Sequence, residues 1–166
     1  TRLTCDWSSD VCSSDLTVDG VRDPDTGRLL GVAVWSAPGE TGMRTAALPE
    51  YVRAIGLGGL ARALRVSDAI DAHRPAVPHW YLKAVGVAPD ATGGGIGRTL
   101  LASRLEVVDA DGSPAYLESS NARTTALYRR HGFVPLTRVP WPDGAGPLAM
   151  WRGGHAESSG ADGASQ

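Results

Sequence analysis

A cluster of glycines between two apolar segments constrains the fold of this 166-residue chain more than any other feature. The segment Trp80–Val87 is largely apolar, and the run Ala-Pro-Asp-Ala-Thr-Gly-Gly-Gly-Ile-Gly-Arg follows it. Apolar residues then recur at helical spacing from Leu100 to Val108. This order predicts a strand, a glycine-rich turn and a helix. Free amide groups at such a turn, together with the positive end of the helix dipole, favour phosphate, so we expect a phosphorylated cofactor there.

Two common phosphate-binding loops do not fit this sequence. A P-loop requires a lysine directly after the glycines, and none is present there. A dinucleotide fingerprint requires a glycine three residues after Gly95, where the chain has Arg98. The spacing V-x-P-x-x-x-G-x-G-x-G-x-x-L-L instead resembles motif A of the GNAT superfamily of N-acetyltransferases, whose loop wraps the pyrophosphate of acetyl-CoA. The chain departs from that motif at Thr92, where the family usually has glutamine or arginine, and at Gly94, where a basic residue is common.

A second block, residues 115–134, predicts a strand, a turn, a helix and another strand. Asn121 is suited to cap the helix, and Gly132 is suited to the left-handed position that ends one. The block resembles GNAT motif B, N-x-x-x-x-x-x-Y-x-x-x-G-F. Both motifs occur in the order and at the separation found in the superfamily, which favours it over two ordinary strand–helix units. The resemblance covers about residues 18–152, and the approach to motif A looks most like actinobacterial members.

The resemblance implies an α+β fold, with a mixed, mostly antiparallel sheet and helices on both faces. Residues 18–22 and 29–35 predict a hairpin around Asp23–Gly27, and this hairpin matches the second and third strands of the family. We therefore expect the first strand and the first two helices of the fold to be missing. Two short helices are predicted at 49–55 and 60–71, and either could line the acceptor pocket or serve only packing.

The chain divides into three predicted segments. Residues 1–16 are expected to be artefactual or disordered, because they resemble a translated sequencing adaptor, and they hold both cysteines. Residues 17–152 are the predicted acetyl-CoA-dependent N-acetyltransferase domain, and residues 153–166 are a predicted disordered tail. A domain without cysteine fits a cytoplasmic location. The net charge of −2 and the absence of a long apolar run predict neither a nucleic-acid partner nor a membrane partner.

The resemblance also implies how acetyl-CoA is held. Backbone amides of the loop would bind the pyrophosphate, and the cofactor arm would pair with the strand before the loop, between two strands that splay apart. Residues 84–86 are the expected place for a bulge that frees an N–H toward the thioester oxygen. The residues expected to contact acetyl-CoA are Val85, Val87, Thr92, Gly93, Gly94, Gly95, Ile96, Gly97, Arg98 and Asn121.

Two side chains are candidates for the chemistry. Tyr128 matches the family tyrosine that protonates the departing sulfur, although a helix tyrosine of this kind also packs in cores. Glu118 is the candidate general base, because it falls on the second splayed strand. His79 is an alternative base, and an ordered water is another; both Glu118 and His79 are also compatible with purely structural roles. No metal site is expected.

The expected function is transfer of an acetyl group from acetyl-CoA to a primary amine by direct attack in a ternary complex. No residue is placed to carry the acetyl group covalently, and the amine itself is not identified. The alternative is a non-catalytic acyl-CoA-binding or interaction module with the same fold. A homodimer through an exposed sheet edge is a further candidate.

Overall fold

The computed structural model describes residues 17–39, 70–141 and 144–154. The predicted adaptor-like segment, the predicted helix at 49–55 and nearly all of the predicted tail lie outside the described residues. Of the predicted helix at 60–71, only the last two residues are described, and both are helical.

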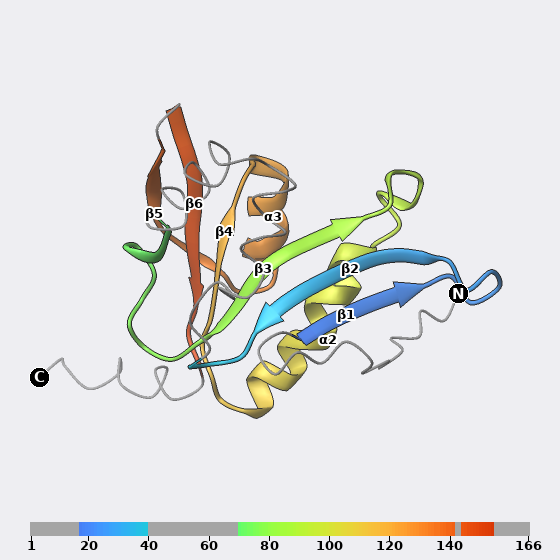
Figure 1. Cartoon of the computed structure of the whole chain (residues 1–166), viewed down its shortest axis with the longest axis horizontal. Coiled ribbons are helices and arrows are strands. Elements are labelled where there is room, and N and C mark those ends of the chain that lie inside the picture. The colour runs from blue at the N-terminus through green and yellow to red at the C-terminus, as the bar shows by residue number, and fades with distance from the viewer. Residues whose placement is uncertain (1–16, 40–69, 142–143, 155–166) are drawn as a thin grey trace, which may run out of the picture.

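Six strands form one mixed sheet in the order β1-β2-β3-β4-β6-β5 (Figure 1). All neighbouring strands are antiparallel except β3 and β4, which are parallel, so the predicted α+β fold with a mostly antiparallel sheet is confirmed. The elements are β1 Thr17–Arg22, β2 Leu29–Ser36, β3 Trp80–Val87, a 3-10 turn η2 Pro89–Ala91, α2 Ile96–Ala110, β4 Ala115–Ser119, α3 Ala122–Arg130, β5 Val134–Trp141 and β6 Gly144–Arg152.

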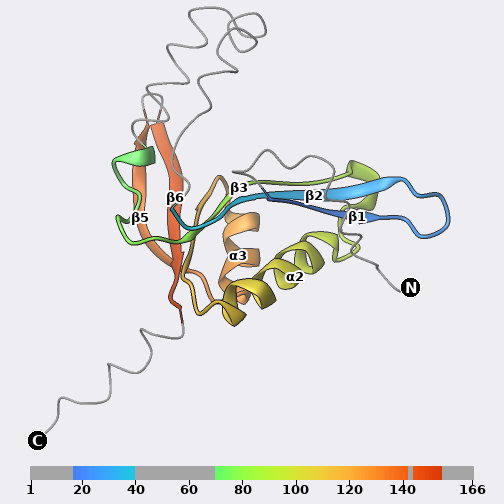
Figure 2. The same ribbon diagram turned by 60° about the horizontal axis from the view of Figure 1, so that its bottom comes forward.

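Helices α2 and α3 lie along the same face of the sheet (Figure 2). On the other face, the described residues contain the end of a helix at Ile70 and Asp71, and Ile70 packs against the small cluster of Tyr116, Val139 and Ala149. The main hydrophobic core lies on the helix side of the sheet. It contains all four apolar positions that the sequence predicts for the helix after the glycine-rich turn, α2: Leu100, Leu101, Leu105 and Val108. No helix in the described part of the chain has the length and apolar composition needed to cross a bilayer.

Local signals in the sequence set the turns and helix ends that the structure shows. Asp23 Oδ1 accepts hydrogen bonds from the amides of Asp25 and Thr26, at 3.0 and 2.9 Å, and so closes the β1–β2 turn. Asn121 caps α3, because its side chain accepts a hydrogen bond from the amide of Thr124. Gly132 follows α3 with a φ of 85°, as predicted for the residue that ends this helix.

The sheet opens between β3 and β4. These strands pair only at their beginnings, through Trp80 with Ala115, Tyr81 with Tyr116, and Leu82 with Leu117, whereas β3 stays paired with β2 as far as Val87. A register shift leaves Lys83 as the extra residue of β3. The bulge thus begins directly where β3 leaves β4, one residue before the predicted segment 84–86, which is a correction to the sequence-based position.

Candidate active site

The glycine-rich loop presents bare backbone at the start of α2. Gly93 and Gly95 adopt φ values of 94° and 82°, which L-residues avoid, and a Cβ on either would meet no atom within 4 Å. No side chain caps α2, and none of the backbone hydrogen bonds recorded for the described residues uses the amides of Gly95, Ile96, Gly97 or Arg98 as donors. Four amide groups at a helix N-terminus are therefore available to an anion.

Other residues of the loop fix its shape. The Thr92 hydroxyl donates a hydrogen bond to the carbonyl of Ala88 at 3.3 Å, and the amide of Gly94 donates one to the carbonyl of Ala91 at 3.3 Å. Asp90 forms an ion pair with Arg28 from the β1–β2 hairpin, with 2.6 Å between Arg28 Nη2 and Asp90 Oδ2. The Thr92 side chain, at the position where the family usually has a longer polar residue, is thus bonded within the loop.

The end of β3, the start of α2 and helix α3 meet at Gly97. A Cβ at Gly97 would lie 3.6 Å from Leu127 Cδ2 of α3 and 3.8 Å from Val87 Cγ2 of β3. Val85 and Val87 are partly buried and pack against the main core, which also holds Ile96. The predicted cofactor-contacting residues of β3 and of the loop are therefore neighbours in space.

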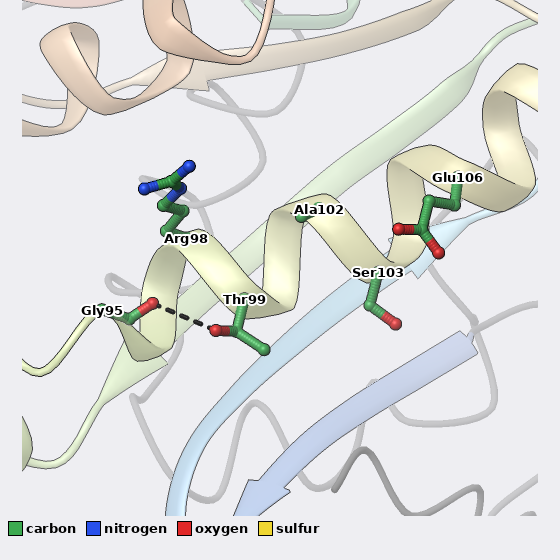
Figure 3. A pocket seen from close by; sticks show the side chains of 6 residues that line it. All are labelled: Gly95, Arg98, Thr99, Ala102, Ser103 and Glu106. Atoms are coloured by element: carbon green, nitrogen blue, oxygen red, sulfur yellow. Dashed lines mark hydrogen bonds between the residues drawn. The ribbon is translucent and has the colours of Figure 1, made fainter. Parts of the chain in front are cut away.

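Arg98 is exposed on the first turn of α2. It borders a surface hollow of about 460 Å³ along α2. Figure 3 shows the six residues that line this hollow, all at the start of α2 or along it: Gly95, Arg98, Thr99, Ala102, Ser103 and Glu106. The pKa of His131, which follows α3, is lowered chiefly by burial and further by the positive charges of Arg98 and two other arginines. Arg98 thus adds positive potential beside the free amides.

Asn121 sits at the start of α3, where its side chain serves the backbone. Its Oδ1 accepts from the Thr124 amide at 3.0 Å, and its Nδ2 donates to Ser120 Oγ at 3.3 Å. The capping role that the sequence predicts is present, and the predicted contact with the cofactor arm stays a prediction.

Tyr128 lies on the helix side of the sheet. It is only 5 % exposed and packs edge-on against Phe133, with 6.1 Å between ring centroids. Burial disfavours the phenolate and raises the pKa of Tyr128 to about 12, so its hydroxyl is protonated at neutral pH.

Glu118 lies on the opposite face, where residues of β3 and β4 that alternate with the main core gather. The Tyr81 hydroxyl donates to Glu118 Oε2 at 2.8 Å, and Tyr116 stands two residues before Glu118 on β4. Burial raises the pKa of the Glu118 carboxyl and outweighs the hydrogen bond from Tyr81, which lowers it. A carboxyl held in this way accepts a proton more readily than an exposed one.

His79, the alternative base, is packed at the edge of the same cluster. Its Nδ1 donates to the carbonyl of Val77 at 2.6 Å, and its ring meets Tyr116 and Trp151 edge-on at 5.4 and 5.5 Å. Burial lowers the pKa of the imidazole, so His79 is neutral at physiological pH. These surroundings are those of a packed core histidine.

The two candidate catalytic side chains thus lie on opposite faces of the sheet. The sequence-based interpretation did not include Tyr81, Tyr116 or Arg74 in the site. The alternation of β3 could have placed Tyr81 opposite the main core, but its pairing with Tyr116 depends on a long-range register. No local signal marks Arg74, whose guanidinium carbon lies 4.1 Å from the centroid of the Tyr81 ring.

Comparisons with known proteins agree with this architecture. Residues 23–133 match the model of the acetyltransferase (GNAT) family. Over 55 residues, 33 % of this chain and 22 % of the relative, the chain is 40 % identical to an uncharacterized N-acetyltransferase of Schizosaccharomyces pombe. Over 55 residues, 31 % of this chain and 18 % of the relative, it is 44 % identical to mycothiol acetyltransferase of Beutenbergia cavernae. The matches thus span about a fifth of the length of these curated relatives.

Two solved structures share the fold. A crystal structure of an acetyltransferase from Corynebacterium glutamicum superposes with a TM-score of 0.61 and 28 % identity, covering 87 % of this chain and 68 % of that one. The ribosomal-protein-S18-alanine N-acetyltransferase of Escherichia coli superposes with a TM-score of 0.52 and 19 % identity, covering 86 % of this chain and 71 % of that one. The second likeness concerns the fold alone.

Proposed function

Because the chain belongs to the acetyltransferase (GNAT) family, we propose that it transfers an acetyl group from acetyl-CoA to a primary amine. The amine attacks directly in a ternary complex. The proposal names no particular amine as the acceptor.

The observation that carries this proposal is the opening between β3 and β4 next to the uncapped start of α2. Beyond Leu82 and Leu117 the two strands no longer pair, so the inner edge of β3 is free to pair with an extended arm. The amides of residues 95–98 lie at the far end of that edge and suit a pyrophosphate. One extended molecule with a pyrophosphate at one end and an amide-rich arm, as in acetyl-CoA, matches both features.

Each remaining task falls to a residue of the described chain. Acetyl-CoA, when bound, supplies an activated thioester. The bulge at Lys83 bends β3 at the head of the opening, and a preorganised N–H of β3 directed into the opening would stabilise developing charge on the thioester oxygen, on the order of 3 kcal/mol. Glu118 takes a proton from the amine, and the protonated hydroxyl of Tyr128 gives one to the departing sulfur.

The first test is calorimetric titration of acetyl-CoA into the protein. Gly95→Val is expected to weaken binding, because it forces a side chain into the left-handed region beside the free amides. Gly112→Val is the matched control: Gly112 also has a positive φ and open space around it, but it lies after the other end of α2. Equal losses in both variants, or no binding by the unaltered protein, would contradict the cofactor half of the proposal.

The second test follows thiol release in the presence of a panel of primary amines. Tyr128→Phe keeps the ring against Phe133 and is expected to bind acetyl-CoA normally while losing most of its turnover, about 100-fold or more. A protein that binds acetyl-CoA but acetylates no amine would instead be an acyl-CoA-binding module. Full turnover in Tyr128→Phe would remove Tyr128 from the mechanism.

A further inference from the structure

Positive charge gathers where the first turn of α2 meets the end of α3. A Cβ on Gly97 of α2 would lie 3.6 Å from Leu127 Cδ2 of α3, so the two helices are in contact there. Arg98 directly follows Gly97 on α2. Arg130 and His131 come three and four residues after Leu127, which places them on the side of α3 that faces α2. The charges of Arg98 and Arg130 both act on the His131 imidazole, so the three side chains form one group, here called the cationic cluster.

The cationic cluster has no acidic partner among the residues that the structure describes. Arg98 is exposed and forms no hydrogen bond or ion pair with them. Arg130 uses only its Nε, which donates to the carbonyl of Ala126 at 3.2 Å. The terminal nitrogens of both guanidinium groups can therefore bind an anion, and this planar group matches the oxygens of a phosphate with two parallel N–H groups.

The charged groups that face His131 come from three elements. Burial lowers the pKa of the imidazole most, and the charges of Arg98 from α2, Arg152 from β6 and Arg130 from α3 lower it further. Arg152 also donates to the carbonyl of His131 and forms an ion pair with Asp109 of α2. His131 is therefore neutral at physiological pH. An anion placed among these groups would stabilise the protonated imidazole and raise its pKa.

The cationic cluster lies next to the amides at the start of α2. The surface hollow of about 460 Å³ extends along α2 from Gly95 and is bordered by Arg98, so open space adjoins the guanidinium (Figure 3). The backbone amide of Arg98 is itself one of the four amides available to an anion. A molecule that places one phosphate group on these amides can therefore reach the cationic cluster with another.

Taking the proposed binding of acetyl-CoA as given, we propose that the cationic cluster binds a phosphate monoester, the phosphate on the ribose of acetyl-CoA, and that His131 gains a proton when this phosphate binds. The guanidinium groups of Arg98 and Arg130 bind the phosphate oxygens, and the imidazole donates an N–H to one of them. The proton comes from solvent, and no covalent bond to carbon or phosphorus forms or breaks.

The sign of the proton exchange separates His131 from the phosphate itself. A phosphate monoester has a second pKa of about 6, and guanidinium groups favour its dianion, so the phosphate alone would release protons on binding. The bound dianion raises the pKa of His131, so the imidazole takes protons up. The affinity for acetyl-CoA should therefore fall as pH rises through the pKa of His131 in the complex.

The first test compares acetyl-CoA with acetyl-dephospho-CoA, which lacks only the ribose phosphate, in calorimetric titrations of the full chain. The unaltered protein is expected to bind acetyl-CoA about 10-fold or more tightly, because the analogue lacks the charge-assisted hydrogen bonds to this phosphate. Arg130→Gln is expected to remove most of this difference by weakening the binding of acetyl-CoA alone.

The second test counts protons by titrating acetyl-CoA at pH 7 in buffers of different ionisation enthalpy. The unaltered protein is expected to take up a fraction of a proton, and His131→Gln is expected to take up none. Inorganic phosphate is another source of the same chemistry. It is expected to bind the complex with acetyl-dephospho-CoA but not the complex with acetyl-CoA, and equal binding to both would place the ribose phosphate elsewhere and overturn the proposal.

Arg129→Gln is the matched control, because Arg129 is an exposed arginine of α3 that is not among the charges acting on His131. Circular dichroism establishes that each variant is folded. If acetyl-dephospho-CoA binds as tightly as acetyl-CoA, or if Arg129→Gln and Arg130→Gln weaken acetyl-CoA binding equally, the cationic cluster is not the phosphate site, while acetyl-CoA binding stands. Proton uptake that persists in His131→Gln would show that His131 is not the group that gains the proton. If the unaltered protein binds neither molecule, the proposed function fails, and the phosphate site with it.

Discussion

Replacing Gly31 with alanine tests how β2 supports the phosphate-binding end of α2. A Cβ at Gly31 would lie 2.7 Å from Ile96 Cγ2, 3.1 Å from the carbonyl oxygen of Gly86 and 3.2 Å from Leu100 Cδ1. The two side chains belong to buried positions of α2 and have little space to turn away, and the carbonyl belongs to the neighbouring strand. Overpacking of this kind costs about 1–3 kcal/mol of unfolding free energy. For a chain of this length each kcal/mol lowers Tm by about 2–4 °C.

Urea unfolding followed by circular dichroism measures this loss, and Gly86→Ala is the control. Gly86 lies on the adjacent strand, but a Cβ there would meet nothing within 4 Å, so its unfolding free energy should change by less than about 0.5 kcal/mol. Because Ile96 begins α2, Gly31→Ala should also weaken acetyl-CoA binding in a calorimetric titration. Equal stabilities of the two variants would refute the packing argument, and unchanged acetyl-CoA affinity would refute the link from β2 to the loop.

Three further changes have definite expected outcomes. Asp19→Ala removes the ion pair that Asp19 forms with Arg104, which is 3 % exposed, and should cost about 1.5–3 kcal/mol in chemical unfolding, whereas a loss below about 1 kcal/mol would contradict a buried pair. Burial raises the pKa of Glu118 in the folded state, so the protein loses stability as pH rises from the ordinary value of 4.5 toward the pKa of the folded state. Glu118→Gln should flatten this decline in a series of Tm measurements at different pH. An unchanged slope would contradict the raised pKa of Glu118. Arg152→Met removes hydrogen bonds to the His131 carbonyl and to Asp109, so Tm should fall by an amount corresponding to about 1–3 kcal/mol, and no fall would show that the bonds are solvent-replaced.

Features that depend on neighbours along the chain were predictable from the sequence. The Asp23 turn, the Asn121 cap and the left-handed Gly132 each act within a few residues, so their residue types identify them directly. The apolar face of α2 was predictable for the same reason, since its period is local. The fold itself was predicted from the resemblance of the two motifs, which contain Gly95, Asn121 and Gly132 at fixed spacing.

Features that depend on distant pairing were not predictable in the same way. The bulge falls at Lys83 because β2 and β3 slip by one residue, and nothing in the local sequence of β3 marks that slip. Arg104 belongs to the apolar face of α2, where a charged residue is unexpected, and its ion pair with Asp19, 85 positions away, accounts for its burial. The hydrogen bond from Tyr81 to Glu118 likewise joins residues 37 positions apart.

The short pairing between β3 and β4 divides the sheet into two parts, here called leaves. One leaf is β1-β2-β3 with α2 packed on it, and the other is β4-β6-β5 with α3 packed against β4. The seam between them holds three residue pairs, whereas every other pair of neighbouring strands holds five or six. The two leaves are held together below the sheet by the core that α2 and α3 share, and by the ion pair of Asp109 on α2 with Arg152 on β6. An arm that pairs with β3 would therefore add hydrogen bonds where the sheet itself supplies the fewest.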